Sequence, residues 1–196
     1  LGKLGTRAVH AVPFLLALTA DTNVAWFCTD GQGRWTTPGR EAAYALGRIG
    51  PVALDSVLLL VPASRPSMRM NAAIALGEIG SPAAVPALLT LLKDSDWAVR
   101  EQAAVALGKI KDSSAMEPLS AALKDPEWKV RMAAISAIAG IGGKAAVEPL
   151  LSVLDDRFPH IRAAATACLR DITGQDFGDT RDTWMKWWQE QKHTMQ

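Results

Sequence analysis

The fold of this 196-residue chain is decided by two stretches, RMNAAIALGEIG at residues 69–80 and REQAAVALGKIK at residues 100–111. The same pattern recurs as REAAYALGRIG (40–50), RMAAISAIAGIG (131–142) and RAAATACLRDIT (162–173). The five copies align on an apolar residue spaced by 30, 31, 31 and 31 positions, namely Leu46, Leu76, Leu107, Ile138 and Leu169. A period of about 31 residues is the length of two short helices joined by tight turns. The repeats therefore predict an all-α fold built from helix pairs.

A second helical pattern precedes most of these blocks. Apolar residues recur there at i, i+3, i+4 and i+7, as in Leu54, Val57, Leu58 and Val61, Val85, Leu88, Leu89 and Leu92, and Val147, Leu150, Leu151 and Leu154, with Met116, Leu119 and Leu123 close to it. This spacing is the buried stripe of an amphipathic helix. Gly50, Gly80 and Gly142 follow the repeated blocks and fit the left-handed C-cap of a helix.

The repeated motif V-R-x-x-A-A-x-A-L-G-x-I, with an aspartate six residues before the arginine, resembles the HEAT-like repeat of the phycobilisome-lyase type over nearly the whole chain. The resemblance implies a right-handed α-solenoid of about five helix pairs, in which the second helix of each pair lines the concave surface. It also implies that aspartates and arginines tie successive repeats together, here Asp94, Asp125, Asp156, Arg69, Arg100, Arg131 and Arg162. An aspartate ahead of a helix is also suited to capping its free N–H groups. Gly39 and Ala63 stand where the pattern has arginine and aspartate.

The array is expected over residues 1–173, and it departs from the regular period at its N-terminal end. Residues 1–5, LGKLG, match LGRIG at 46–50, so we expect the chain to begin in the tail of a truncated repeat of a longer parent protein. The apolar edge of such a repeat favours an end-to-end dimer. An insertion of about 21–39 carries Trp26, Phe27 and Trp35 around a DGQG turn. Two interpretations are open, a cover for apolar surface and a partner-binding loop.

Residues 174–196 are expected to form a tryptophan-rich cap helix. Trp184, Trp187 and Trp188 fall at i, i+3 and i+4, which places them on one helix face. The last repeat of a solenoid must hide its outer apolar face, so a cap is the favoured interpretation. The alternative is that the tryptophans form a platform for a ligand.

The amino-acid composition indicates which classes of binding partner to expect. Apolar residues make up 49% of the chain and charged residues 21%, which is typical of a soluble protein. A net charge of +1 lacks the excess of positive charge that nucleic-acid and anionic-membrane binders carry, so we expect neither partner. Cys28 and Cys168 match no zinc or redox spacing and are expected to be free thiols. The sequence leaves the compartment open, with a lean toward the cytoplasm.

Catalytic chemistry is not expected. His10, His160 and His193 do not occur at metal-ligand spacings, and no nucleophile or phosphate-loop motif is present. We therefore expect no catalytic residue, no metal and no cofactor, and a chain that is not an enzyme.

The candidate binding residues are the variable positions of the second helices. Repeat alignment places Tyr44, Ile74 and Val105 in one row. Met70 and Met132 form the row one helical turn away, Trp97 and Trp128 lie at its edge, and Glu101 is a further variable position. Aromatic residues and methionine are enriched at the centres of protein interfaces. The alternative is that these side chains are ordinary core.

The favoured hypothesis is a non-catalytic scaffold that binds a protein or peptide on its concave face. The family resemblance suggests an alternative, an accessory subunit of a bilin lyase or chaperone-lyase. A HEAT-like nucleic-acid-binding protein ranks third, because acidic residues at the variable positions offset the basic ones, Glu41, Glu78 and Glu101 against Arg40, Arg48 and Lys109.

Overall fold

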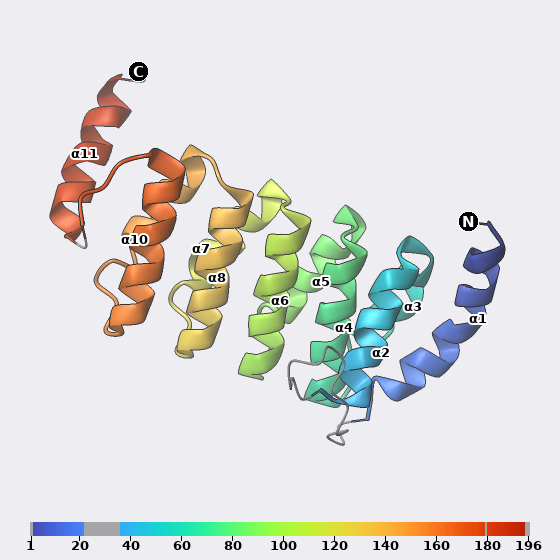
Figure 1. Ribbon diagram of the computed structural model, residues 1–196. Coiled ribbons are helices and arrows are strands. Elements are labelled where there is room, and N and C mark those ends of the chain that lie inside the picture. The colour runs from blue at the N-terminus through green and yellow to red at the C-terminus, as the bar shows by residue number, and fades with distance from the viewer. Residues whose placement is uncertain (1, 22–35, 179, 195–196) are drawn as a thin grey trace. The chain divides into compact units, whose positions relative to one another are not determined.

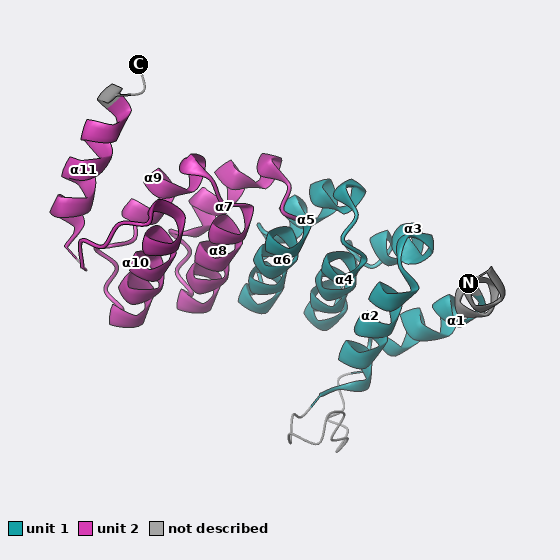
Figure 2. Ribbon diagram, turned by 45° about the horizontal axis from the view of Figure 1, so that its top comes forward, with its two compact units in different colours: residues 1–110 teal, residues 111–196 magenta. Residues whose placement is uncertain are grey.

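The computed structural model describes residues 2–21, 36–178 and 180–194 (Figure 1), and the regular elements within these residues are α-helices and short 3-10 helices. The chain divides into two compact units, residues 1–110 and residues 111–196 (Figure 2). The prediction of an all-α solenoid of HEAT-like helix pairs is confirmed in each unit.

In unit 1 the second helices of consecutive pairs stand side by side. Helix α4 packs against both α2 and α6, while the first helices α3 and α5 pack against α4 and α6, and α1 packs against α2 (Figure 1). The elements are α1 (Gly2–Leu18), α2 (Pro38–Ile49), η1 (Pro51–Ala53), α3 (Leu54–Leu58), α4 (Pro66–Ile79), η2 (Pro82–Ala84), α5 (Val85–Leu91) and α6 (Trp97–Ile110).

Unit 2 repeats this arrangement and ends with an additional helix. Helix α8 packs against α7 and α10, α9 packs against α10, and the last helix α11 packs against α9. The elements are η3 (Ser113–Ala115), α7 (Met116–Ala122), α8 (Trp128–Ile141), η4 (Lys144–Ala146), α9 (Val147–Leu151), α10 (Pro159–Thr173) and α11 (Arg181–Thr194).

The buried core is formed by the residues that recur in each repeat. All five residues on which the repeats align are 0% exposed, Leu46, Leu76, Leu107, Ile138 and Leu169. The alanine pairs at 42–43, 72–73 and 103–104 are buried as well, which allows helix backbones to lie close together. Each pair therefore buries its apolar face against its neighbours.

The N-terminal helix differs from the prediction of a repeat tail at residues 1–5. Helix α1 runs without a break from Gly2 to Leu18. In the matching block, Gly50 has a φ of 82° and is followed by Pro51, which cannot continue the helix. Gly5 is followed by Thr6, and a glycine inside a helix costs only about 1 kcal/mol, so nothing ends the helix there.

Of the three predicted left-handed C-caps, only Gly80 is confirmed. Gly50, Gly80 and Gly142 all end their helices with positive φ, but Gly50 and Gly142 have a ψ of −152° and −164°, which lies outside the left-handed helical region. At the position equivalent to Gly80, the third repeat has Lys111, whose φ is 59°. A left-handed conformation costs a residue with a Cβ about 1–2 kcal/mol more than glycine.

We predict that Lys111→Gly raises the free energy of unfolding by about 1 kcal/mol, because it relieves this backbone strain. Thermal melting followed by circular dichroism measures the change. The matched control is Gly80→Ala, which should lower stability by a similar amount, since a Cβ there meets nothing within 4 Å and only the backbone is strained. A less stable Lys111→Gly variant would contradict the prediction.

Candidate functional site

Three of the predicted binding residues lie together in unit 1. Tyr44 on α2, Ile74 on α4 and Val105 on α6 line one cavity of about 220 Å³, here called the groove. Its other lining residues are Arg40, Ala73, Gly77, Gln102, Ala106 and Lys109. Ile74 is 5% exposed and forms part of the core as well, whereas Val105 is 37% exposed. The groove thus takes one predicted side chain from each of three successive repeats.

Small residues bring the helices of the groove close together. A Cβ at Gly77 would lie 2.8 Å from the Cβ of Ala106, and a Cβ at Gly47 would lie 2.1 Å from the Cβ of Glu78. Both distances are shorter than nonbonded carbon atoms allow, so only glycine fits at these positions at this spacing. The repeated Leu-Gly pair therefore sets the spacing between α2, α4 and α6 at the groove.

One charged group of the groove is already paired within the protein, and other polar groups are not. Lys109 Nζ lies 2.5 Å from Glu78 Oε1, which pairs α6 with α4. The side chains of Arg40, Tyr44 and Gln102 make no hydrogen bond or ion pair within the described part of the chain. The groove therefore combines an apolar floor with a guanidinium, a hydroxyl and an amide that are available to a partner.

Three other predicted residues of unit 1 lie outside the groove lining. Met70 is half-buried on α4 and Glu101 is half-buried on α6. Trp97 is the first residue of α6 and is 39% exposed. The structure thus leaves Trp97 accessible, but it does not bring these three side chains into the cavity with Tyr44.

In unit 2, Trp128 belongs to an aromatic cluster that sequence reasoning missed. Trp128 is 37% exposed at the start of α8, and its ring meets His160 edge-on, with 4.9 Å between the ring centres. His160 also lies 5.5 Å from the ring of Phe158, which the guanidinium of Arg157 covers at 4.7 Å. Repeat alignment places Trp128 and His160 near the start of consecutive second helices, but it does not show that their rings meet. Met132 is half-buried one turn further along α8.

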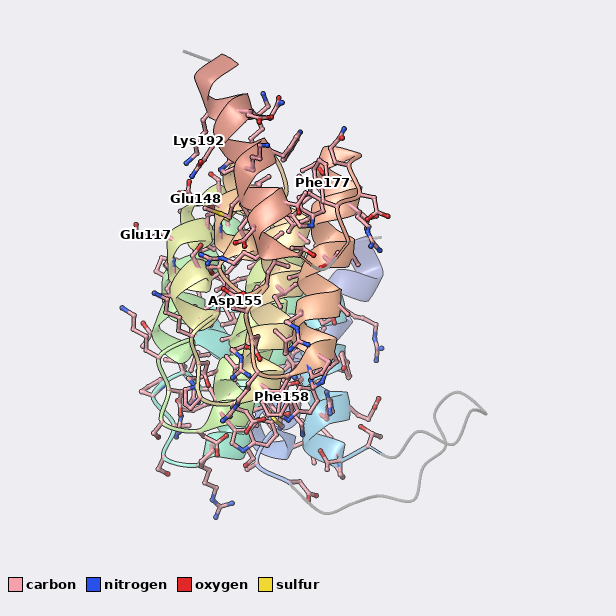
Figure 3. All side chains as sticks on the ribbon, turned by 90° about the vertical axis from the view of Figure 1, so that its left-hand side faces the viewer. Glu117, Glu148, Asp155, Phe158, Phe177 and Lys192 are labelled. Carbon is pink, nitrogen blue, oxygen red and sulfur yellow. The ribbon has the colours of Figure 1, made fainter. Side chains whose placement is uncertain are left out.

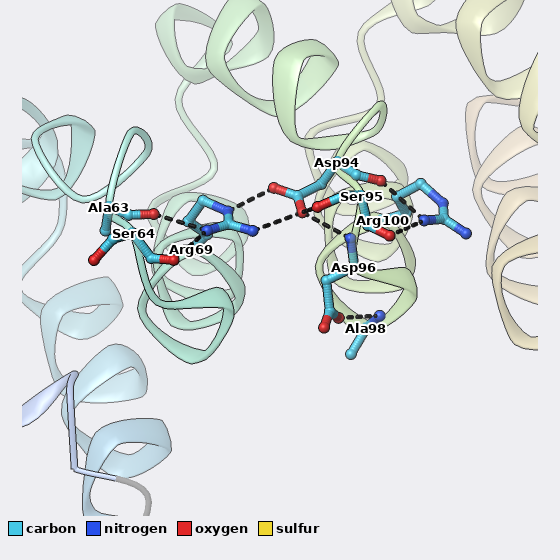
Figure 4. A network of polar contacts seen from close by, with 8 residues as sticks. All are labelled: Ala63, Ser64, Arg69, Asp94, Ser95, Asp96, Ala98 and Arg100. Carbon is cyan, nitrogen blue, oxygen red and sulfur yellow. Dashed lines mark hydrogen bonds and ion pairs between the residues drawn. The ribbon is translucent and has the colours of Figure 1, made fainter.

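Two of the repeat arginines, Arg69 and Arg131, act as clamps between helix pairs, and Figure 4 shows the contacts of Arg69. Arg69 donates from Nε and Nη2 to the two carboxylate oxygens of Asp94, at 2.6 and 2.8 Å, and from Nη1 to the carbonyl oxygen of Ala63. Arg131 repeats this pattern in unit 2, with Asp156 as the carboxylate and Asp125 as the carbonyl. Each arginine therefore joins a carbonyl of its own repeat to a carboxylate of the next repeat.

The aspartates of these clamps cap a turn, which differs from the expected helix cap. Asp94, Asp125 and Asp156 each accept a hydrogen bond from the amide two residues later, at 2.9 Å, in the loop before the helix. The hydrogen bonds from Arg69 lower the pKa of the Asp94 carboxyl more than burial raises it. For Asp156, burial raises the pKa, but the Phe158 amide and Arg131 together lower it by more. Both carboxylates thus stabilise the folded chain in their charged form.

We predict that Asp94→Asn lowers the free energy of unfolding at pH 7 by about 2 kcal/mol, because it removes charge-assisted hydrogen bonds to Arg69. The folded-state pKa of Asp94 lies below its unfolded value of about 3.9, so this stabilisation is present above about pH 4 and is lost as the pH falls through the folded pKa. The difference in melting temperature between variant and wild type should therefore shrink in acid. Asp55→Asn is the control, since Asp55 is exposed and forms no ion pair within the described residues; a pH-independent difference for Asp94→Asn would contradict the prediction.

The predicted cap is present as α11, and its tryptophans divide into two groups. Trp184 is 0% exposed, donates its indole N–H to the Gly178 carbonyl at 2.9 Å and meets Phe177 edge-on. Helix α11 packs against α9, and Lys192 forms an exposed ion pair with Glu148 of α9 at 2.8 Å (Figure 3). These contacts support the cap interpretation.

Trp187 and Trp188 line a cavity instead. This cap cavity has a volume of about 360 Å³ and lies between η4, α9, the end of α10 and α11. Its lining residues are Gly143, Lys144, Val147, Ile172, Thr173, Trp187, Trp188 and Gln191. Trp188 is 7% exposed, and its buried indole N–H has no acceptor among the described residues; an unsatisfied buried donor costs about 1–3 kcal/mol.

The described residues show few features of metal-binding, thiol-dependent or membrane-spanning proteins. Within residues 2–21, 36–178 and 180–194, no group of three or more His, Cys, Asp or Glu side chains could hold a metal. The Cys168 thiol is half-buried, and burial, with a contribution from Asp171, raises its pKa, which disfavours the reactive thiolate. No helix in that part of the chain has the length and apolar content needed to cross a lipid bilayer. Trp26, Phe27 and Trp35 lie outside the described residues, so their partner-loop role stays a prediction.

Comparison with known proteins identifies the repeats. Residues 54–126 and 116–181 match the family model for HEAT repeats. A chain of the complex of CpcE and CpcF of phycocyanin lyase from Nostoc sp. PCC7120 is similar in structure, with a TM-score of 0.66 at 23% identity over 82% of this chain and 98% of that chain. A designed armadillo repeat protein in complex with the peptide (KR)4 has a TM-score of 0.58 at 19% identity, covering 84% of this chain and 82% of that chain. No curated protein matches this chain. At these identities the structural similarities show the fold.

Proposed function

Because this chain belongs to the HEAT-repeat family, we propose that it is a non-catalytic scaffold that binds a protein or peptide on the face formed by the second helices of its repeats. The observation that carries this proposal is the groove, in which Tyr44, Ile74 and Val105 come from three successive repeats. Trp97, Met70 and Glu101 of unit 1 and Trp128 and Met132 of unit 2 are proposed as further contacts.

The dimensions of the groove favour a peptide over a small molecule. Its volume of about 220 Å³ lies below the 300–1,000 Å³ of typical small-molecule pockets. Equivalent side chains from neighbouring repeats recur along the groove, which suits an extended segment that crosses the helices and places a side chain at each repeat. Tyrosine and arginine, present here as Tyr44 and Arg40, are also the residue types that contribute most to interface affinity.

The charged residues that line the groove indicate which kind of peptide it would bind. The designed armadillo repeat protein is in complex with the basic peptide (KR)4. In this chain the charged residues that line the groove are Arg40 and Lys109, and because Lys109 is paired with Glu78, the positive charge of Arg40 is the one left to face a peptide. A strongly basic peptide is therefore a poor match, and a neutral or acidic segment with apolar side chains is expected.

We predict that the full chain selects peptides from a random display library. Combining Tyr44→Ala with Val105→Ala should lower the affinity for the selected peptides at least tenfold. Two truncated apolar side chains remove contact area from the floor of the groove, and a tenfold loss corresponds to about 1.4 kcal/mol. Binding is measured by fluorescence anisotropy, with circular dichroism to check the fold. Lys93→Ala is the control, since Lys93 is exposed in unit 1 and does not line the groove. Equal affinity of the double variant, or no enriched peptide, would contradict the proposal.

A second candidate function is an accessory subunit of a bilin lyase or chaperone-lyase. It is favoured by the structural similarity to a chain of the phycocyanin lyase complex, almost all of which is covered.

Under this candidate, mixing the chain with free bilin should shift the visible absorption band, because a protein surface that holds the tetrapyrrole changes its conformation and surroundings. Absorption spectroscopy at increasing protein concentration measures the shift. The control is the same titration with an unrelated helical protein in the same buffer. An unchanged spectrum with the chain in excess would remove this candidate and leave the peptide-binding proposal intact.

A further inference from the structure

We propose that the groove of unit 1 holds its peptide through an acidic side chain, an aspartate or a glutamate, and that Arg40 is the residue that selects it. This inference rests on the proposed function, because it concerns the same groove, and it names the feature of the peptide that the groove recognises. The observation that carries it is a half-buried guanidinium in the groove lining that has no partner within the described residues.

Arg40 differs from the other arginines that the fold shields from solvent. Among the arginines whose burial the structure describes, the other buried or half-buried ones each donate to a carboxylate or a carbonyl oxygen of the chain, namely Arg69, Arg100, Arg131 and Arg162. The Arg40 side chain is half-buried on α2, and no described residue accepts a hydrogen bond from it. A guanidinium has five N–H donors, and burial without acceptors costs free energy. An anion supplied by a partner would offset that cost.

Two further hydrogen-bonding groups line the same cavity. Tyr44 lies one helical turn after Arg40 on α2, and Gln102 lies on α6. Both side chains are half-buried, and neither makes a hydrogen bond within the part of the chain that the structure describes. A carboxylate can accept a bidentate pair from a guanidinium and a further hydrogen bond from a hydroxyl or an amide. A carboxylate therefore suits this set of donors better than a neutral amide does.

The two cations of the lining stand at opposite edges of the apolar row. Arg40 precedes Tyr44 by one helical turn, whereas Lys109 follows Val105 by one turn. Lys109 is paired with Glu78, so the charge at its edge is already compensated. Charge complementarity thus places the acidic side chain of the peptide at the Arg40 edge, while its apolar neighbours lie on the row.

The acidic residues beside Arg40 do not compensate its charge. Glu41 follows it on α2, and Glu101 occupies the equivalent position on α6, but neither of them lines the cavity. Within the described residues, neither carboxylate forms an ion pair with Arg40. The groove therefore presents one uncompensated positive charge beside an apolar floor, which matches an acidic residue next to apolar ones.

The test uses the full chain and peptides selected on it from a random display library. We expect aspartate or glutamate to be enriched at one position of the selected peptides. The strongest binder is then synthesised in two forms, one with this acidic residue and one with asparagine or glutamine in its place. Both forms end in a carboxamide, so a C-terminal carboxylate cannot contribute. Fluorescence anisotropy should show that the neutral form binds about tenfold more weakly, the effect of losing a charge-assisted hydrogen bond.

Variants of α2 assign this preference to Arg40. Arg40→Gln should bind both forms equally, because it lacks the charge that distinguishes them. Arg48→Gln is the matched control, since it makes the same change of charge on the same helix at an exposed residue that does not line the groove; it should keep the tenfold preference. Circular dichroism checks the fold. If Arg40→Gln does not fold, Arg40→Lys decides, because it keeps the charge but loses the bidentate geometry and should reduce the preference to about threefold.

The outcomes separate this inference from the proposed function. Selected peptides that bind in the groove but show no preference for the acidic form would overturn the inference and leave the proposed function intact. A preference that Arg40→Gln retains in full would overturn the role of Arg40. Binding that requires a free C-terminal carboxylate would replace the acidic side chain as the recognised group. Failure to select any peptide would overturn both proposals.

Discussion

A pair of short helices cannot bury its apolar face alone, so every pair of this chain depends on the pair beside it. The contact that makes this possible is the close approach of consecutive second helices, where a Cβ on Gly77 would fall 2.8 Å from that of Ala106. This approach buries the leucines of the repeat, sets the width of the groove and brings the repeat arginines within reach of the next aspartate. Stability and the candidate binding surface therefore arise from the same contact.

In the first two complete repeats, the arginine and the aspartate that would form a clamp are both absent. Gly39 stands at the arginine position and Ala63 at the matching aspartate position, so neither charge is left buried without its partner. A Cβ on Gly39 would lie 2.7–2.9 Å from the Asp21 and Thr19 carbonyls and the Asn71 amide. Asn71 donates to the Thr19 carbonyl at 2.9 Å, which joins the end of α1 to α4. An amide bridge thus occupies the space that an arginine would need.

The sequence predicts the features that follow from periodicity. The 31-residue spacing gives the helix pairs, the five buried alignment residues and the row of Tyr44, Ile74 and Val105 that lines the groove. Two features are not predicted by the period alone. Residues 1–5 copy the end of a repeat helix, yet α1 continues because no proline follows Gly5. The aromatic cluster around Trp128 and His160 needs two helices to be placed before their rings can meet.

The cap shows the same limit more sharply, because helical spacing treats its tryptophans alike. Trp184 and Trp188 lie at i and i+4 on one face of α11, and both are buried as that spacing predicts. The surrounding backbone distinguishes them. The loop before α11 brings the Gly178 carbonyl to the Trp184 N–H, whereas one turn further along the Trp188 N–H has no hydrogen-bond acceptor within the described part of the chain. Burial of an indole can be read from a pattern, but satisfaction of its N–H depends on atoms that the pattern does not place. For that reason the tryptophan spacing alone does not distinguish the indole that a backbone hydrogen bond holds from the indole that lacks one.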